Sequence, residues 1–151
     1  MSSDRTGLGH ARTLDVFWGD CDAAGVVFYP NYFRWFDAAT HALLVSLGRP
    51  HRDLTARYDA IGLMLVDAQC SFTAPATFED VLTIESTASA LGARRVVVEH
   101  RITRGDTLIC TGREVRVFAR QTPEGVRAAP LPADLAALLG GPAITAPATD
   151  P

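Results

Sequence analysis

The sequence contains no lysine, and all 14 of its basic residues are arginine. Any anion that this protein binds must therefore be held by a guanidinium group, a backbone N–H or a histidine. The arginines form no continuous stripe, and the formal net charge is only −3. This pattern gives no reason to expect a nucleic-acid partner.

Long apolar runs are absent as well. No stretch approaches the about 20 residues that a membrane-spanning helix needs, and residues 1–12 lack the apolar core of a signal peptide. There are three cysteines, Cys21, Cys70 and Cys110, and no pair has the spacing of metal ligands. We therefore expect a cytoplasmic protein with reduced cysteines and no membrane partner.

Motifs for metals and cofactors are also missing. The histidines are scattered, with no pairing at helical or hairpin spacing, at His10, His41, His51 and His100. No glycine-rich loop has the pattern that cradles phosphates. The expectation is a protein with neither a bound metal nor a cofactor.

What the sequence does contain is the composition of one globular domain. Its 151 residues are 48% hydrophobic and 21% charged, which suits a single packed core. We expect residues 1–10 to be a flexible lead-in and residues 11–140 to form the domain. Residues 141–151 are small and proline-rich, and we expect a disordered tail there.

A long buried helix is predicted after residue 29. Pro30 suits the first turn, because its missing N–H would have no partner there. Apolar residues recur in steps of three and four, at Tyr32, Phe36, Ala39, Leu43 and Leu47. Gly48 marks the end of the helix.

The remaining apolar segments have the alternation of strands. Strands are predicted over 13–18, 62–73, 81–91, 94–104 and 107–120, with a short helix over 132–139. Short turns between the last three strands imply antiparallel hairpins. One long helix covered by one sheet is an α+β layout, and the uncovered strand edges favour oligomerisation.

Two carboxylates stand just before the predicted helix, in the segment WGDCDAAGVVFYPN. The first N–H groups of a helix carry partial positive charge and can polarise a bound carbonyl. Asp20 or Asp22 beside such a site could attack that carbonyl or activate water. Aspartates before helices are also common caps and turn formers, and Cys21 is more typical of a small buried residue than of a nucleophile.

The stretch from Gly19 to Tyr32, followed by Arg34-Trp35 and Asp37-Ala38-Ala39, closely resembles the 4-hydroxybenzoyl-CoA thioesterase family. The resemblance continues at residues 71–72, 80–85, 100 and 114–119, and covers roughly residues 12–135. It implies the hotdog fold, in which a five-stranded antiparallel sheet wraps a long central helix. It also implies an enzyme, an acyl-CoA thioesterase.

The resemblance implies roles for individual residues. Asp22 matches the catalytic aspartate, as a nucleophile or a general base. Tyr29 matches the residue whose backbone N–H holds the thioester oxygen, and Gly25 would let the loop approach the ligand. Arg94 and Arg95 match residues that hold the phosphates of coenzyme A. Asp20 is expected to be structural.

Other matches concern the surroundings of the site. Arg34, Asp37 and His100 match family positions and are expected to support structure more than chemistry. Leu63-Met64 replaces a Thr-Pro pair of the 4-hydroxybenzoyl enzyme, which predicts a less polar acyl pocket. The helix from Tyr32 to Leu47 contains no glutamate, so this chain belongs with the aspartate type rather than the branch with a helical glutamate.

The predicted substrate is an aromatic, 4-hydroxybenzoyl-CoA-like, or short-to-medium acyl-CoA. The alternatives are a thioesterase acting on acyl groups carried by acyl carrier protein and a non-catalytic acyl-CoA-binding module. The resemblance further implies a homodimer that assembles into a homotetramer.

Overall fold

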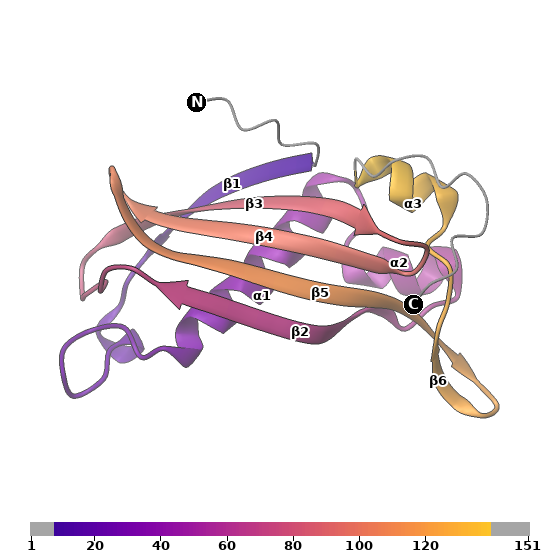
Figure 1. The fold of residues 1–151 in the computed structure, drawn as a ribbon, viewed down its shortest axis with the longest axis horizontal. Coiled ribbons are helices and arrows are strands. Elements are labelled where there is room, and N and C mark those ends of the chain that lie inside the picture. The colour runs from indigo at the N-terminus through magenta and orange to yellow at the C-terminus, as the bar shows by residue number, and fades with distance from the viewer. Residues whose placement is uncertain (1–7, 140–151) are drawn as a thin grey trace.

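A curved antiparallel sheet wraps one long helix in the computed structural model, which describes residues 8–139 (Figure 1). The strands are β1 (Leu8–Asp15), β2 (Gly62–Phe72), β3 (Val81–Leu91), β4 (Arg95–Arg104), β5 (Thr107–Thr122) and β6 (Gly125–Ala128). The helices are α1 (Pro30–Ser46), α2 (His51–Tyr58) and α3 (Ala133–Leu138), with a 3-10 turn, η1, at Trp18–Asp20. The sheet order is β1-β3-β4-β5-β2, and β6 pairs with β5.

Helix α1 has the buried face that its sequence pattern predicts. Its buried side chains include Tyr32, Phe36, Ala39 and Leu43. At the other end Gly48 adopts a left-handed φ of 68°, and its N–H donates to the Val45 carbonyl. A residue without Cβ takes up this conformation without strain, so the helix stops where the glycine stands.

The strands of the sheet differ in how well they are covered. β3 and β4 alternate between buried and less buried positions, as expected for a sheet with one face on a helix. β2 lies at one edge, and most of its residues are exposed. Its exposed apolar side chains are Met64, Leu65, Val66 and Phe72. A long apolar edge of this kind is normally covered in the native assembly.

The packing of α1 on the sheet centres on Phe36. Its ring is fully buried and stacks on the His100 ring, with centroids 4.7 Å apart and planes 7° from parallel. A Cβ atom at Gly112 would lie 2.3 Å from the Phe36 ring. The glycine in β5 therefore makes room for the helix side chain.

The predicted α+β layout is confirmed, with differences at the ends of elements. Strand β1 begins at Leu8, so residues 8–10 pair with β3 although we assigned them to the lead-in. Helix α2 occupies a segment to which the sequence analysis assigned no element, and β6 adds a sixth strand. Residues 1–7 and the predicted tail 141–151 lie outside the described residues. Between residues 8 and 139, no helix is long and apolar enough to cross a membrane.

Candidate active site

Asp20 holds together the loop that leads into α1. Its Oδ2 accepts a hydrogen bond from the Phe17 N–H at 2.8 Å. Its backbone carbonyl accepts the Phe28 N–H and the Asn31 side-chain amide, both at 2.8 Å. These bonds fix the approach of the chain to the helix, which is the structural role expected for Asp20.

Asp22 stands at the start of a tight turn. The Gly25 N–H donates to the Asp22 carbonyl at 3.0 Å, and the Ala24 N–H donates to Asp22 Oδ1 at 2.8 Å. Gly25 has a φ of 81°, which disfavours any other residue type. The side chain is exposed, and within residues 8–139 Oδ2 has no hydrogen-bond partner. One carboxylate oxygen is thus anchored while the other is available.

The amide of Tyr29 is a donor that the start of α1 leaves unpaired. Pro30 has no N–H. The Asn31 N–H donates to the Phe28 carbonyl at 2.9 Å, and the Tyr32 N–H donates to the Tyr29 carbonyl at 3.2 Å. Among the described residues, no acceptor pairs with the Tyr29 N–H. A free N–H at the positive end of a helix can bind a carbonyl oxygen and its developing negative charge.

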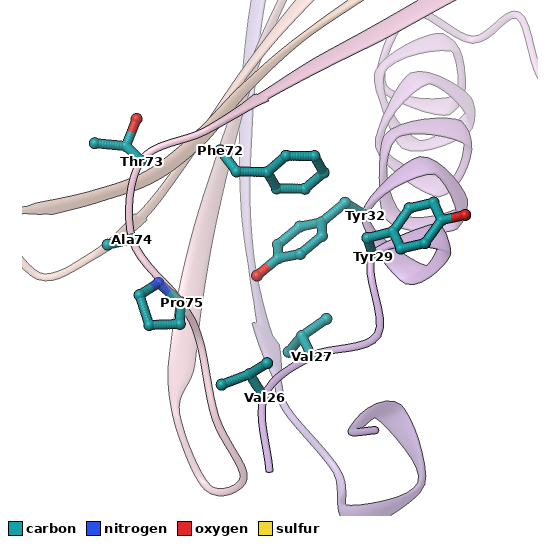
Figure 2. Close-up of a pocket in the computed structure, with 8 residues that line it drawn as sticks. All are labelled: Val26, Val27, Tyr29, Tyr32, Phe72, Thr73, Ala74 and Pro75. Atoms are coloured by element: carbon teal, nitrogen blue, oxygen red, sulfur yellow. The ribbon is translucent and has the colours of Figure 1, made fainter. Parts of the chain in front are cut away.

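An apolar cavity of about 310 Å³ opens beside this amide (Figure 2). It is lined by Val26, Val27, Tyr29, Tyr32, Phe72, Thr73, Ala74 and Pro75. The Tyr32 ring points into the cavity, whereas the Tyr29 ring points away from it. Burial raises the pKa of Tyr32 to about 12, so its hydroxyl stays protonated in neutral solution.

The structure brings some predicted site residues together and separates others. Asp22, Gly25 and Tyr29 share one loop–helix junction, although Asp22 does not line the cavity. Arg95 pairs with Val117 of β5, at the end of the sheet that carries α2, α3 and β6 (Figure 1). The cavity lies toward the other end of the same chain. Arg94 and Arg95 are therefore remote from the Asp22 loop within one copy.

Leu63 and Met64 begin β2 and thus also lie toward the α2 end. Leu63 lines a separate cavity of about 290 Å³ together with Asp37, His41 and Arg116. The prediction that Leu63-Met64 shapes a less polar acyl pocket is not tested by the fold of a single copy.

A buried polar network joins α1 to the sheet, and sequence patterns alone do not predict it. Glu114 Oε1 lies 2.9 Å from His100 Nε2 and accepts the Thr40 hydroxyl at 2.5 Å. Its Oε2 accepts Arg116 Nη2 at 2.7 Å, and the same nitrogen donates to Asp37 at 2.8 Å. Alternating polar residues in β4 and β5 were the available signal, but only the packed fold shows that they meet.

The network holds Glu114 as a charged group inside the protein. Burial alone would raise the pKa of Glu114, but the hydrogen bond to His100 and the charge of Arg116 outweigh it, so that the pKa falls to about 2. Ser86 Oγ lies 2.8 Å from His100 Nδ1, which completes the order Ser-His-Glu of a catalytic triad. These three residues are only 2–3% exposed, so no substrate reaches Ser86 and the network is structural.

No candidate metal centre appears in the described part of the chain, where no group of three His, Cys, Asp or Glu side chains is placed to hold an ion. The three cysteines are free thiols. Cys21 Sγ lies 3.8 Å from the Phe17 carbonyl, and no basic residue pairs with it among residues 8–139. This setting does not favour a thiolate nucleophile.

A carboxylate loop before a helix, an unpaired N–H at the helix start and an adjacent apolar cavity define a site suited to acyl transfer. Residues 16–139 match the model of the Thioesterase-like superfamily, and the chain belongs to this family. It is an enzyme, a thioester hydrolase.

Two members of the family are more than 30% identical to this chain in sequence. The chain is 37% identical over 125 residues to 4-hydroxybenzoyl-CoA thioesterase of Pseudomonas sp. strain CBS-3, covering 79% of this chain and 89% of that protein. The solved structure of that enzyme superposes with a TM-score of 0.78 at 34% identity, over 86% of this chain and 98% of the other. A gentisyl-coenzyme A thioesterase structure gives a TM-score of 0.72 at 34% identity, over 82% and 97%.

A more distant relative is 1,4-dihydroxy-2-naphthoyl-CoA hydrolase of Synechococcus elongatus. It is 28% identical over 102 residues, which cover 68% of this chain and 75% of that protein. The names of all three relatives describe thioesters of hydroxylated aromatic acids with coenzyme A.

Proposed function

We propose that this enzyme hydrolyses the thioester of an aromatic acyl-CoA to the free acid and coenzyme A, with Asp22 as nucleophile or general base. The observation that carries the proposal is the unpaired Tyr29 N–H beside the Asp22 loop and the apolar cavity. A donor of this kind suits the oxygen of a thioester carbonyl, because that oxygen gains negative charge when the carbon is attacked.

The nucleophilic route has two steps. Asp22 Oδ2 attacks the carbonyl carbon, the C–S bond breaks, and coenzyme A leaves as a thiolate that is then protonated. Water hydrolyses the resulting anhydride and regenerates the Asp22 carboxylate. In the general-base route, Asp22 removes a proton from water while the water oxygen attacks the carbon, and the same C–S bond breaks. Neither route uses a metal or a cofactor.

The choice of acyl group is supported by the cavity and by the relatives. Valine, tyrosine and phenylalanine side chains line the cavity, which favours an apolar or aromatic acyl group over a charged one. Substrates of the 4-hydroxybenzoyl-CoA type are the first class to test, followed by short-to-medium aliphatic acyl-CoA.

The test is thiol release from a panel of benzoyl-, 4-hydroxybenzoyl-, phenylacetyl- and aliphatic acyl-CoA thioesters. Asp22→Asn should reduce kcat by at least about 10³-fold, because the amide is neither a nucleophile nor a base. Asp106→Asn is a matched control in the exposed β4–β5 turn and should retain wild-type turnover. Undiminished turnover in Asp22→Asn would refute the role of Asp22.

The same assay separates the two alternatives. A thioesterase that works on acyl carrier protein would hydrolyse a carrier-bound acyl group faster than the same group on CoA. A binding module would bind acyl-CoA without releasing thiol. The anchored turn at Asp22 favours catalysis, since a module that only binds has no need of an available carboxylate there.

We further propose a homodimer in which two copies pair along the edge strand β2, and a homotetramer built from two such dimers. The support is the row of exposed apolar residues along β2, which edge pairing would cover. The free thiols are consistent with a proposed cytoplasmic location. Light scattering of the purified protein would give the mass of the assembly.

A further inference from the structure

The hydroxyl of Tyr32 is a buried polar group at the apolar cavity beside the Tyr29 amide. The Tyr32 ring points into this cavity (Figure 2), although the residue is only 3% exposed. The Tyr29 ring points away from the cavity, and Thr73 is an exposed residue. Most of the remaining lining consists of valine, phenylalanine, alanine and proline side chains, which offer the Tyr32 hydroxyl no polar partner.

The Tyr32 hydroxyl receives a hydrogen bond and donates none. Burial raises the pKa of Tyr32 to about 12, and a hydrogen bond from the Ala76 N–H to its oxygen offsets part of this rise. The group therefore keeps its proton at neutral pH. Among residues 8–139, no acceptor pairs with that proton. A buried donor without an acceptor costs free energy, which an acceptor on a bound ligand would recover.

Other aromatic side chains hold the Tyr32 ring in place. The ring makes edge contacts with Trp35 and Phe72, with ring centroids 5.3 Å and 5.4 Å apart. Trp35 belongs to α1, whereas Phe72 is the last residue of β2. Because these contacts come from two elements, the hydroxyl is oriented before a ligand binds. Little side-chain entropy is then lost when it donates a hydrogen bond.

Tyr29 and Tyr32 present two unpaired donors to the same cavity. They are three residues apart at the start of α1, a spacing that places residues on one face of a helix. The Tyr29 N–H suits the thioester oxygen. The Tyr32 O–H is a second donor, directed into the space beside that amide. A ligand that satisfies both donors has one oxygen on the thioester carbonyl and another within the acyl group.

The surroundings of the Tyr32 hydroxyl restrict the chemistry of this second oxygen. Val27, Phe72 and Pro75 line the cavity, and a charged group would lose its hydration beside them. Within the described chain, no basic residue lines the cavity to pair with a carboxylate. A neutral acceptor, such as a hydroxyl or methoxy oxygen on an aromatic ring, meets these conditions.

We propose that Tyr32 determines specificity by donating its hydroxyl proton to a neutral oxygen on the ring of an aromatic acyl-CoA. This inference rests on the proposed function, which places the acyl group in this cavity. A site built to bond such an oxygen discriminates against a ring that lacks it, because the buried donor is then left unpaired. This partner for the acyl group is independent of Leu63 and Met64, which lie toward the α2 end of the sheet.

The first test compares thioesters that differ only in the acceptor. Hydroxybenzoyl-CoA and methylbenzoyl-CoA, each substituted at the ortho, meta or para position, are similar in size, but a methyl group accepts no hydrogen bond. At the ring position that Tyr32 reaches, the wild-type kcat/KM should be about tenfold higher for the hydroxyl compound, the effect of one hydrogen bond. Tyr32→Phe should abolish this preference, so that both compounds are hydrolysed at similar rates.

Tyr58→Phe is the matched control. It removes a hydroxyl on α2 that is already paired with Asp134 and lies outside this cavity, so the wild-type preference should be retained. A preference that persists in Tyr32→Phe overturns the inference, as does its absence at every ring position in the wild-type enzyme. An equal loss of activity on hydroxyl and methyl compounds would assign the Tyr32 hydroxyl to the pantetheine arm of the substrate, and this result also overturns the inference.

A binding measurement separates this inference from the proposed function, because it needs no turnover. Hydroxyphenacyl-CoA thioethers place a methylene between sulfur and carbonyl and cannot be hydrolysed as thioesters. In calorimetric titrations, one of the three ring isomers should bind the wild-type protein about tenfold more tightly than phenacyl-CoA does, and Tyr32→Phe should bind both alike. This result without turnover of any thioester would refute the proposed hydrolysis and support the role of Tyr32. Equal affinities of the wild-type protein for all these analogues overturn that role.

Discussion

Two sets of polar residues in this molecule contain the residue types of a hydrolytic site. They differ in whether their hydrogen-bonding groups are paired. Ser86, His100 and Glu114 form a hydrogen-bonded line inside the sheet, where each group is satisfied and shielded from solvent. Asp22 and Tyr29 lie on the surface, each with one group unpaired in the described structure. A completed network stabilises the fold, whereas an unpaired group within reach of solvent can engage a substrate.

The largest effect is expected when the carboxylate charge of the buried network is removed. Glu114→Gln leaves Arg116 without its buried partner and should lower the free energy of unfolding by about 3–5 kcal/mol. Urea denaturation would measure the loss. Glu99→Gln, on an exposed position of the same sheet, should change stability by less than about 0.5 kcal/mol. Lost turnover with stability unchanged would instead assign the network to catalysis.

The corresponding change at the surface site is Tyr29→Pro. Proline deletes the unpaired N–H, and the Tyr29 φ of −55° already suits a proline ring. Turnover should fall by about 10²–10³-fold, as for the loss of an oxyanion-hole donor, with little change in melting temperature. Tyr29→Phe keeps the N–H and should retain activity, because the Tyr29 ring points away from the cavity. Equal activities in these two variants would contradict the role of the amide.

The third prediction concerns the stability of the folded protein at low pH. The pKa of Glu114 is about 2 in the folded protein, against an ordinary value of 4.5, so the unfolded chain takes up a proton first as the pH falls. The stabilisation is therefore complete above pH 4.5 and is lost between pH 4.5 and 2, by about 3 kcal/mol in all. Melting curves across this range should fall more steeply for the wild type than for Glu114→Gln. Parallel curves would count against a charged Glu114 in the core.

The smallest effect is expected at the turn that carries Asp22. A Cβ at Gly25 would meet nothing within 4 Å, so Gly25→Ala strains only the left-handed backbone, at a cost of about 1 kcal/mol. Stability should fall by that amount, and turnover should fall with it as the turn rearranges. Gly19→Ala, which also meets nothing within 4 Å and has no positive φ, is the control. If Gly25→Ala changed neither stability nor turnover, the left-handed backbone at Gly25 would not be required by the turn.

Sequence patterns were sufficient for the long helix and five of the strands, and insufficient for α2, for β6 and for the contacts between elements. The spacing of Tyr32, Phe36 and Ala39 predicted the buried face of α1, because helix periodicity is local. The Glu114 network could not be predicted in this way, since it depends on the register of β4 on β5 and on the seating of α1. The roles of Asp22 and Tyr29 came from family resemblance and remain predictions.

The same limit applies to arginines that come from different elements. Arg57 and Arg120 are far apart in the sequence, and they line one cavity because α2 packs at the end of β5. Arg94 and Arg95 were predicted as phosphate contacts from the family resemblance, and that role remains a prediction. Local motifs are found by reading along the chain, whereas sites assembled from several elements require the fold.

The close packing of Phe36 against Gly112 has a consequence for the evolution of the sequence. A Cβ at position 112 would lie 2.3 Å from the Phe36 ring, so a side chain there forces the ring out of its stacked position on His100. A methyl group at 112 is accommodated at least cost when the residue at 36 is smaller. The two positions are therefore expected to covary among homologues, and each constrains which substitutions at the other are accessible.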